Sequence, residues 1–315
     1  MELSLFFVGT GGSVPSAQRG LPATLLRRGG ERILFDCGEG TQRQLVRSVG
    51  LAELDAVFLT HLHADHWLGL PGMLKSFELR DRERPLSVYG PPGTRAALER
   101  LRPVFGRPRF GLTFAEPEPD EALERDGYRI VPFLVRHRGT AYGYAIVEDD
   151  RPGRFDAARA HALGVRPGPD FGRLQRGEAV DSVSPEQVVG PGRRGRRVVL
   201  TGDTAPTDAV VVAAHGADVL VHEATFGDED RERAAQTLHS TARQAATVAD
   251  DAEVALLALT HLSSRYPARR LLEEAREVFA HAEVPRDFDA IDVPFPERGG
   301  PELVEWRRAT QRAEA

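Results

Sequence analysis

Four residues that can bind a metal ion lie close together in the segment His61-Leu62-His63-Ala64-Asp65-His66. The segment directly follows an apolar run that predicts a buried strand. In an extended chain, residues two apart point the same way, so His61 and His63 can converge on one ion. Asp65 and His66 follow where we expect the chain to turn into a helix, and from there they can face a second ion. Imidazole nitrogen and carboxylate oxygen are ligands that zinc accepts readily. We therefore favour a metal site over a solvent-exposed, His-rich turn.

Three further candidates for metal binding also come directly after predicted strands. They are His137, Asp203 and His261, each of which stands at the end of an apolar run. Taken alone, a His or Asp in such a place is more often a cap or turn residue. However, the loops that leave the carboxyl ends of strands form the binding crevices of α/β proteins. Together the three residues could supply the ligands that a two-metal centre still lacks.

The elements that must position these residues are predicted by short apolar runs that alternate with helical patterns. This mixture indicates a layered α/β architecture. The predicted strands are rich in Val, Ile, Leu and Phe and are bounded by Gly, Pro or Asp. They are Leu3–Val8, Arg32–Phe35, Ala56–Thr60, Leu86–Tyr89, Arg129–Phe133, Tyr142–Val147, Arg197–Thr201, Asp218–Val221 and Val254–Thr260. The predicted helices are Glu39–Val49, Leu68–Leu79, Gly93–Val104, Pro206–His215, Ser240–Ala249 and Ala268–Ala280.

Residues 148–195 interrupt this alternation. They are rich in Gly, Pro and Arg, and within them only Phe155–Leu163 predicts a helix. A long insertion with little regular structure in a compact domain is usually functional or disordered. We therefore expect a single domain over residues 1–315, with an inserted arm over residues 148–195.

The composition predicts a soluble, globular chain, because 41% of the residues are hydrophobic and 28% are charged. No apolar run is long enough to span a bilayer, and the beginning does not resemble a signal peptide, so we expect a cytoplasmic protein without a membrane partner. The single cysteine, Cys37, excludes an intramolecular disulfide and a thiolate zinc cluster. Any metal site must therefore be built from His and carboxylates. We expect Cys37 to be a small buried residue, because no base partner is evident.

The charge of the chain is unevenly distributed. A net charge of −6 argues weakly against a nucleic-acid partner. Residues 151–200, however, carry ten Arg against five Asp or Glu. Arginine suits phosphate recognition, although an Arg bias throughout a chain in which Lys75 is the only lysine can also reflect a GC-rich genome. The charge therefore does not exclude a nucleic-acid partner.

Beyond the metal motif, the sequence resembles a known family. His61–His66 matches the signature of the metallo-β-lactamase superfamily, which many hydrolases share. Further blocks resemble the ribonuclease Z family more specifically, occur in that family's order and cover most of residues 3–265. These blocks are Gly9–Pro15, Phe35–Gln42, Gly69–Gly72, His222–Phe226 and His239–Ala242.

This resemblance implies an α/β fold, namely the αββα sandwich of the metallo-β-lactamases with its metal site at one edge and an inserted flexible arm. It also implies two zinc ions per subunit, although manganese or iron could bind the same nitrogen and oxygen ligands. The implied ligands are His61, His63 and His137 for one ion, Asp65, His66 and His261 for the other, and Asp203 as the bridge between them.

The function implied by the resemblance is that of a zinc-dependent endoribonuclease, usually a homodimer, that removes the 3′ trailer from precursor tRNA. The cleavage would leave a 3′-hydroxyl on the tRNA and a 5′-phosphate on the trailer. Asp65 would orient the attacking water or take its proton. His239 and Glu223 are the candidates for protonating the leaving oxygen, with Glu223 orienting His239. Asp36 is a candidate for orienting a metal-binding imidazole.

In the arm, the resemblance lies in a Gly-Pro segment, Pro167–Pro169, and in Gly172–Glu178. The family's arm grips tRNA away from the active site, and one subunit's arm serves the site of the other. The substrate-binding residues that we expect here are Arg166, Gly168, Pro169, Arg173 and Arg176.

Other functions would use the same residues differently. A phosphodiesterase that acts on cyclic or modified nucleotides would need the metal ligands but no arm, and it is the principal alternative. A β-lactamase, lactonase or thioesterase would hydrolyse an acyl bond at the same centre. A non-catalytic RNA-binding protein would keep the metal site only as a relic. The arm-like insertion and the block His222–Phe226 favour the tRNA enzyme.

Overall fold

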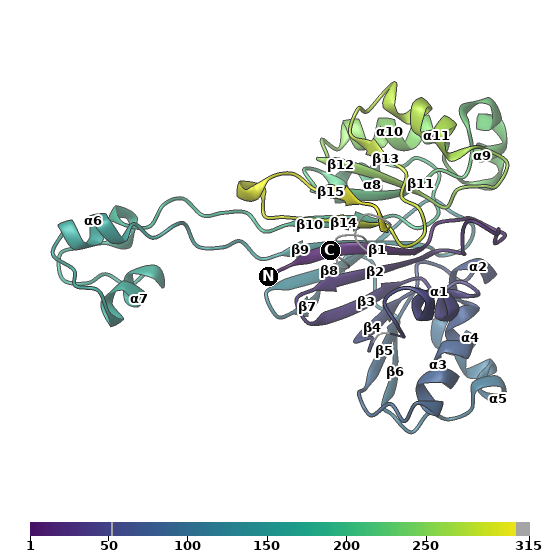
Figure 1. Cartoon of the computed structure of the whole chain (residues 1–315), viewed down its shortest axis with the longest axis horizontal. Coiled ribbons are helices and arrows are strands. Elements are labelled where there is room, and N and C mark those ends of the chain that lie inside the picture. The colour runs from purple at the N-terminus through teal and green to yellow at the C-terminus, as the bar shows by residue number, and fades with distance from the viewer. Residues whose placement is uncertain (52, 307–315) are drawn as a thin grey trace, which may run out of the picture.

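The chain forms a four-layered αββα sandwich, from which one long segment projects (Figure 1). The computed structural model describes residues 1–51 and 53–306. Two mixed β-sheets face each other in the middle, and helices cover the outer face of each sheet. The predicted α/β sandwich is therefore confirmed. Within the described ranges, no helix combines the length and the apolar character that crossing a bilayer requires.

The first sheet has eight strands in the order β15-β14-β1-β2-β3-β4-β5-β6. Its strands are β1 (Leu3–Gly9), β2 (Ala23–Arg28), β3 (Glu31–Phe35), β4 (Ala56–Phe58), β5 (Leu86–Tyr89), β6 (Leu112–Ala115), β14 (Ala290–Asp292) and β15 (Glu302–Val304). The helices on its side of the sandwich are α1 (Thr41–Arg47), α2 (Ala64–Trp67), α3 (Gly69–Leu79), α4 (Thr94–Arg100) and α5 (Arg102–Phe105).

The second sheet has seven strands in the order β13-β12-β11-β10-β9-β8-β7. Its strands are β7 (Leu123–Arg125), β8 (Tyr128–Leu134), β9 (Tyr142–Glu148), β10 (Arg197–Leu200), β11 (Val219–Glu223), β12 (Leu256–Thr260) and β13 (Ala282–Glu283). The helices on its side are α8 (Asp208–Ala214), α9 (Arg231–Thr237), α10 (Ala242–Asp251) and α11 (Ala268–Arg276). Short 3₁₀ turns lie at Pro185–Gln187, Asp228–Asp230 and Pro296–Arg298.

Most strands are buried on both faces, which explains why they look like continuous apolar runs in the sequence. In β1, Leu5 and Phe7 face the other sheet, whereas Phe6 and Val8 face the helices. In β9, Tyr144 and Ile146 likewise point into the space between the sheets. The interior of the sandwich therefore consists of one core between the sheets and one core under each helical layer.

The strand directions bring the polar loops to one edge of the sandwich. Strands β10, β11 and β12 are parallel to one another, and so are β3 and β4. Parallel strands place their carboxyl ends at the same edge of a sheet, where binding crevices form. The loops after β4, β8, β10 and β12 therefore meet there, with the predicted metal-binding residues among them.

Some predicted elements differ from the observed ones. The predicted helix Gly93–Val104 is interrupted at Leu101, because Pro103 has no N–H to donate to the Glu99 carbonyl and its ring would clash with that carbonyl in a continuous helix. The two resulting helices, α4 and α5, pack separately. Strands β2, β6, β7, β13, β14 and β15 were not predicted. Four of these have only two or three residues, which carry too little alternation to be recognised.

The arm contains more regular structure than its sequence predicts. Antiparallel pairs Arg151–Arg193 and Phe155–Val189 continue the β9–β10 pairing into a stalk. At its tip lie α6 (Ala157–Ala162), inside the predicted helix, and a second helix, α7 (Pro169–Gln175), that was not predicted. A proline is well tolerated in the first turn of a helix, so Pro169 does not exclude α7. The tip encloses its own small core of Ala160, Val165, Leu174, Val180, Val183 and Val188.

A buried ion pair joins the two sheets at the base of the arm. Glu148, at the end of β9, accepts hydrogen bonds from Arg196 at 2.6 and 2.8 Å and from Arg28 of β2 at 2.8 Å. The side chains of Glu148 and Arg196 are only 5% and 1% exposed. Burial opposes the charged form of Glu148, but the hydrogen bonds from the two arginines outweigh it and lower the pKa of its carboxyl.

Replacing Glu148 should destabilise the fold strongly. In Glu148→Gln, Arg196 keeps a buried charge without its partner, and the free energy of unfolding should fall by about 3–5 kcal/mol. Because the pKa of Glu148 is depressed in the folded state, the stabilisation is present above about pH 4.3 and is lost as the pH falls further. Urea unfolding at pH 7 measures the difference. The exposed pair Arg269–Glu273 provides the control, since Glu273→Gln should change stability by less than about 1 kcal/mol. Equal effects in both variants would mean that the buried pair stabilises the fold no more than an exposed one does.

Candidate metal centre

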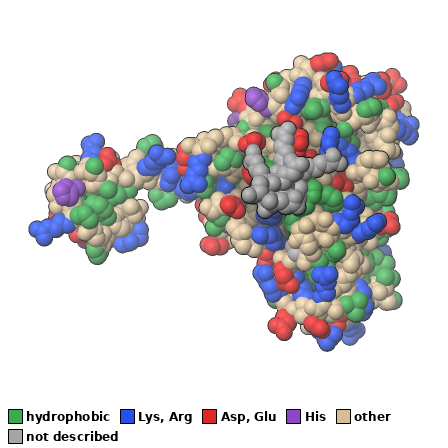
Figure 2. All heavy atoms as spheres, in the orientation of Figure 1, with side chains coloured by type: hydrophobic (Ala, Val, Ile, Leu, Met, Phe, Trp, Pro, Cys, Tyr) green, Lys and Arg blue, Asp and Glu red, His purple; other side chains and the backbone are tan. Residues whose placement is uncertain are grey.

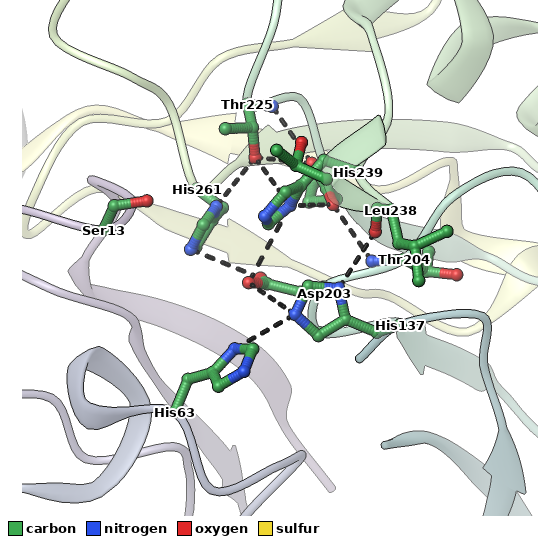
Figure 3. A network of polar contacts seen from close by, with 12 residues as sticks. Ser13, His63, His137, Asp203, Thr204, Thr225, Leu238, His239 and His261 are labelled. Carbon is green, nitrogen blue, oxygen red and sulfur yellow. Dashed lines mark hydrogen bonds and ion pairs between the residues drawn. The ribbon is translucent and has the colours of Figure 1, made fainter. Parts of the chain in front are cut away.

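A first group of metal-binding side chains consists of three histidines and a carboxylate. Its members are His61, His63, His137 and Asp203, whose ligand atoms all lie within 4.8 Å of one another. His63 Nδ1 lies 3.0 Å from His61 Nε2. It also lies 3.1 Å from His137 Nε2 (Figure 3). In a tetrahedral zinc site with Zn–N distances of about 2.0–2.1 Å, neighbouring nitrogens lie about 3.3 Å apart. The nitrogens therefore converge as ligands of one ion do.

A second group lies beside the first and comprises Asp65, His66 and His261. Asp65 and His66 belong to α2, which begins immediately after His63, as the sequence predicts. His261 follows β12, and its Nε2 lies 3.3 Å from Asp65 Oδ2. The structure thus brings together ligand atoms from two segments of the chain that are almost 200 residues apart.

Asp203 lies between the two groups. Its Oδ2 is 3.8 Å from His61 Nε2 and 3.9 Å from His137 Nε2. Its Oδ1 is 3.4 Å from His66 Nε2 and 3.3 Å from His261 Nε2. Oδ2 of this buried carboxylate therefore faces the first group and Oδ1 faces the second. A bridging ligand needs this arrangement.

The outer hydrogen bonds of the histidines suit metal binding. The Nδ1 atom of each of four rings contacts an oxygen at 2.7–3.0 Å, so that Nε2 is the nitrogen that faces the centre. The oxygens are Thr60 Oγ1 for His61, Asp36 Oδ2 for His66, the Leu238 carbonyl for His137 and Thr225 Oγ1 for His261. His63 is the exception, because it presents Nδ1 to the centre.

Two atoms of the centre are buried and lack a hydrogen-bond partner, namely His66 Nε2 and Asp203 Oδ1. Buried polar atoms in proteins are normally satisfied. Because both atoms point into the space between the two groups, a cation held there would satisfy them. The donor set and its unsatisfied atoms thus fit a metal ion.

The electrostatics of the centre also favour a bound cation. Burial opposes the charged form of Asp203, but the neighbouring His261 and His66 outweigh it and hold the pKa of its carboxyl well below its usual range. Burial likewise opposes a charge on His66, yet Asp203 and Asp36 raise the pKa of its imidazole well above normal. For His61, burial and the adjacent His66 lower the pKa, which keeps this ring neutral. The buried carboxylates require positive charge beside them, and a divalent cation meets the same requirement.

Next to the metal-binding groups lies His239 (Figure 3), which pairs with Glu223. His239 Nδ1 is 2.6 Å from Glu223 Oε1 and 3.9 Å from Asp203 Oδ2. Glu223 is fixed in turn by the backbone N–H groups of Thr204 and Thr225 at 3.0 and 3.1 Å. Burial opposes the charge on His239, but the Glu223 carboxylate outweighs it and raises the pKa of the ring to about 9.

Several residues of this site were not identified from the sequence. Thr225 Oγ1 contacts both Glu223, at 2.6 Å, and His261, at 2.8 Å. Its position within the block His222–Phe226 was the available signal. The Leu238 carbonyl turns toward His137 because Leu238 adopts a left-handed conformation with φ of 59°, for which the sequence carries no signal.

The other residues that the sequence analysis singled out lie outside the two metal-binding groups. Cys37 is buried, as predicted, and burial raises the pKa of its thiol. The arm residues Arg166, Gly168, Pro169, Arg173 and Arg176 lie at the tip of the arm, away from the centre, and all five are exposed. Arg173 and Arg176 form ion pairs with the neighbouring Glu178.

Comparisons with known proteins give a consistent result. A family model of the metallo-beta-lactamase superfamily matches residues 20–261. Ribonuclease Z of Haloferax volcanii is 49% identical over 310 residues, which cover 95% of this chain and 98% of that protein. Ribonuclease Z of Myxococcus xanthus is 45% identical over 304 residues, with 94% and 99% covered. The crystal structure of the short form of human tRNase Z is 28% identical with a TM-score of 0.68, and the match covers 92% of this chain and 99% of that one.

Asp36 offers a test of the metal-binding arrangement. Its carboxylate contacts His66 Nδ1 at 2.7 Å and accepts the Thr60 N–H at 2.8 Å. Asp36→Ala should therefore weaken metal binding by about 10–100-fold, because His66 loses its orienting partner. Competition with a chromophoric zinc chelator measures the affinity.

The matched control for this test is Asp55→Ala. Asp55 accepts the Arg32 N–H at 2.8 Å. It precedes β4, whereas Asp36 follows the parallel neighbour β3, so the two carboxylates lie at opposite ends of these strands. Metal affinity should be unchanged in Asp55→Ala. An Asp36→Ala protein that binds zinc as tightly as the wild type would contradict the arrangement.

Proposed function

We propose that this chain, which belongs to the ribonuclease Z family of the metallo-β-lactamase superfamily, is a metal-dependent endoribonuclease that removes the 3′ trailer from precursor tRNA. The sequence-based prediction of this family is confirmed by relatives that match almost the entire chain. The observation that carries the functional proposal is the pair of ligand groups that share Asp203. Cleavage would leave a 3′-hydroxyl on the tRNA and a 5′-phosphate on the trailer.

The cluster of histidines and aspartates supports a metal cofactor. We propose two zinc ions per subunit, one held by His61, His63 and His137, the other by Asp65, His66 and His261, with Asp203 shared between them. When bound, two such ions lower the pKa of water and neutralise the charge of a phosphodiester. Manganese or iron could replace zinc at nitrogen and oxygen ligands.

Asp65 is proposed to orient the attacking water and take its proton. The Ser13 N–H donates to Asp65 Oδ2 at 2.9 Å, and His261 Nε2 lies 3.3 Å from the same oxygen. These contacts fix the carboxylate through Oδ2. Burial opposes ionisation, but the hydrogen bond to His261 and the charge of His66 outweigh it and keep the pKa of Asp65 low. The carboxylate is thus ionised and can accept a hydrogen bond from the attacking water.

His239 is proposed to protonate the leaving 3′ oxygen. The Glu223 carboxylate faces Nδ1 of the ring and stabilises its charged form, so the ring carries a proton at neutral pH. With Nδ1 engaged by Glu223, Nε2 is the nitrogen available to a substrate. The side chain of His239 is 13% exposed, so part of it is accessible from solvent. Glu223 positions the donor and does not itself contact the substrate.

The arm over residues 148–195 is proposed to bind the tRNA at a distance from the cleavage site. Figure 2 shows basic side chains along the arm, all of them arginines, with acidic side chains among them. The exposed loop that contains Arg166 and Gly168 connects α6 to α7 at the tip, and Pro169 begins α7. Arg173 of α7 and Arg176, directly after this helix, could exchange Glu178 for phosphate oxygens. We further propose that the protein is cytoplasmic and forms a homodimer. A mass measurement by light scattering would test the homodimer.

The principal test is cleavage of a precursor tRNA with a 3′ extension, followed by mapping of the product ends. The zinc-loaded wild type should cut once, just after the discriminator base. Asp65→Ala and His239→Ala should lower turnover by at least about 100-fold, the scale of a lost acid–base group, while the affinity for tRNA remains within about threefold.

Two results would contradict these assignments. Equal loss of tRNA affinity and turnover in the variants would mean that the residues bind substrate and do not act in the reaction. No cleavage of precursor tRNA by the wild type, together with rapid hydrolysis of a small phosphodiester, would support a small-molecule phosphodiesterase instead.

The arm can be removed at a place where its two strands lie close together. The backbones of Gly153 and Gly190 approach so closely that a Cβ on Gly153 would lie 1.8 Å from the Gly190 carbonyl oxygen. Joining these two glycines through a short Gly-Ser turn, in place of residues 154–189, should preserve the sandwich. The truncated protein should lose activity on precursor tRNA and retain it on bis(p-nitrophenyl) phosphate. Its tRNA affinity should also depend less steeply on salt, because fewer phosphates are contacted.

A milder variant controls for the truncation. Arg166→Ala should weaken tRNA binding, whereas Arg269→Ala, which removes an exposed arginine of α11, should not. Loss of both activities in the truncated protein would indicate that the arm is part of the fold and would contradict the proposed role.

A further inference from the structure

The loop between β1 and β2 contacts two of the three residues in the second metal-binding group. The Ser13 N–H donates to Asp65 Oδ2 at 2.9 Å. Ser13 adopts a left-handed conformation with φ of 62°, which non-glycine residues adopt only where their surroundings hold them. The position of Asp65 therefore depends on the conformation of this loop.

The same loop also fixes His261. Leu262, the next residue, accepts the Gly12 N–H at 3.1 Å and donates its own N–H to the Thr10 carbonyl at 3.0 Å. His261 itself has φ of 56°, so its backbone is strained and needs this support. A Cβ on Gly12 would lie 2.4 Å from His261 Nδ1, so the imidazole packs directly against the loop backbone.

A single carboxylate holds both ends of this loop. Asp287, in the segment between β13 and β14, accepts the Thr10 N–H at 3.1 Å, the Thr10 hydroxyl at 2.7 Å and the Gly20 N–H at 2.6 Å. It also accepts a hydrogen bond from Gln44 Nε2 of α1 at 2.7 Å. The loop ends are thereby held together and tied to α1, while the middle of the loop contacts Asp65 and Leu262.

We propose that Asp287 is a positioning residue for one of the two metal sites, acting through the loop Thr10–Gly20. The inference rests on the proposed function, because it assumes the two metal sites described above. Asp287 contacts neither a metal ligand nor the substrate. It holds the backbone donors that fix Asp65 and His261, both of which belong to the second group. The group of His61, His63 and His137 has no contact with the loop among the hydrogen bonds of the described residues. Loss of Asp287 should therefore affect the two sites unequally.

Asp287→Asn tests this inference with little change in shape. Four donors converge on the carboxylate, and an amide offers them one acceptor oxygen and an opposing NH₂ group. The wild type should bind two zinc ions per chain. In Asp287→Asn one of the two zinc affinities should stay within about twofold of the wild type, whereas the other should fall by at least about 10-fold, as for loss of an outer hydrogen-bonding partner. Stepwise chelator competition and zinc per chain after dialysis measure both affinities without reference to activity.

Asp289→Asn is the matched control. Asp289 lies two residues along the chain, is 5% exposed, and accepts the N–H groups of Arg286 and Trp306 at 2.8 and 2.9 Å. It holds the C-terminal segment rather than the loop, so both zinc affinities should match those of the wild type. If Asp287→Asn fails to fold, Thr10→Val removes the hydroxyl that donates to Asp287 and accepts from Arg19 of the same loop. This variant should weaken the same zinc site in the same direction.

The outcomes separate this inference from the proposed function. Two zinc ions with unchanged affinities in Asp287→Asn, or in Thr10→Val where that variant is needed, would overturn the role of Asp287 and leave the metal centre intact. Equal weakening of both zinc sites, or the same effect from Asp289→Asn, would mean that Asp287 only stabilises the fold in general. Either result would also overturn its proposed positioning role. A wild type that binds fewer than two zinc ions would overturn the proposed centre itself, and the inference with it.

Discussion

The buried carboxylate of Asp203 is the interaction on which the rest of the site depends. It is 3% exposed, and each of its oxygens faces a different group of histidines at 3.3–3.9 Å. An ionised carboxylate is costly to bury unless positive charge or hydrogen bonds compensate for it. The surrounding residues meet that requirement by directing ring nitrogens inward, which is also the geometry that two adjacent cations need. The inward-facing ring nitrogens therefore serve both purposes: they compensate for the buried charge of Asp203, and they suit the binding of cations.

The surrounding structure fixes the orientation of the ligands in advance. Four imidazoles are oriented through Nδ1 by oxygens that come from different parts of the sandwich, including Asp36, Thr225 and the Leu238 carbonyl. Such outer contacts limit the freedom of each ring, so that binding of an ion would require little reorganisation. Asp36, Leu238 and His261 adopt strained left-handed backbone conformations in this arrangement. The tight packing of the two sheets supports them.

The centre and the arm are separate parts of one chain. The sandwich provides a rigid edge for the chemistry, whereas the arm leaves that edge through a stalk that continues β9 and β10 and carries its own apolar core. The ion pair of Glu148 with Arg196 lies where the stalk joins the sheets, so the base of the arm is held by the same core that supports the centre. The arm can therefore vary without disturbing the metal-binding residues.

The sequence alone predicted the sandwich, most of its longer strands and the residues of the metal centre. Strands buried on both faces leave continuous apolar runs, and ligands that follow such runs are recognisable by residue type. Tertiary structure alone decided which atoms face the centre and what holds them. Asp203 lies between two groups only because β4, β8, β10 and β12 end at one edge. The role of Asp287 could not be predicted, since its partners lie more than 240 residues away. A hydrogen bond to a distant backbone amide leaves no pattern in the sequence, because every residue except proline offers the same donor.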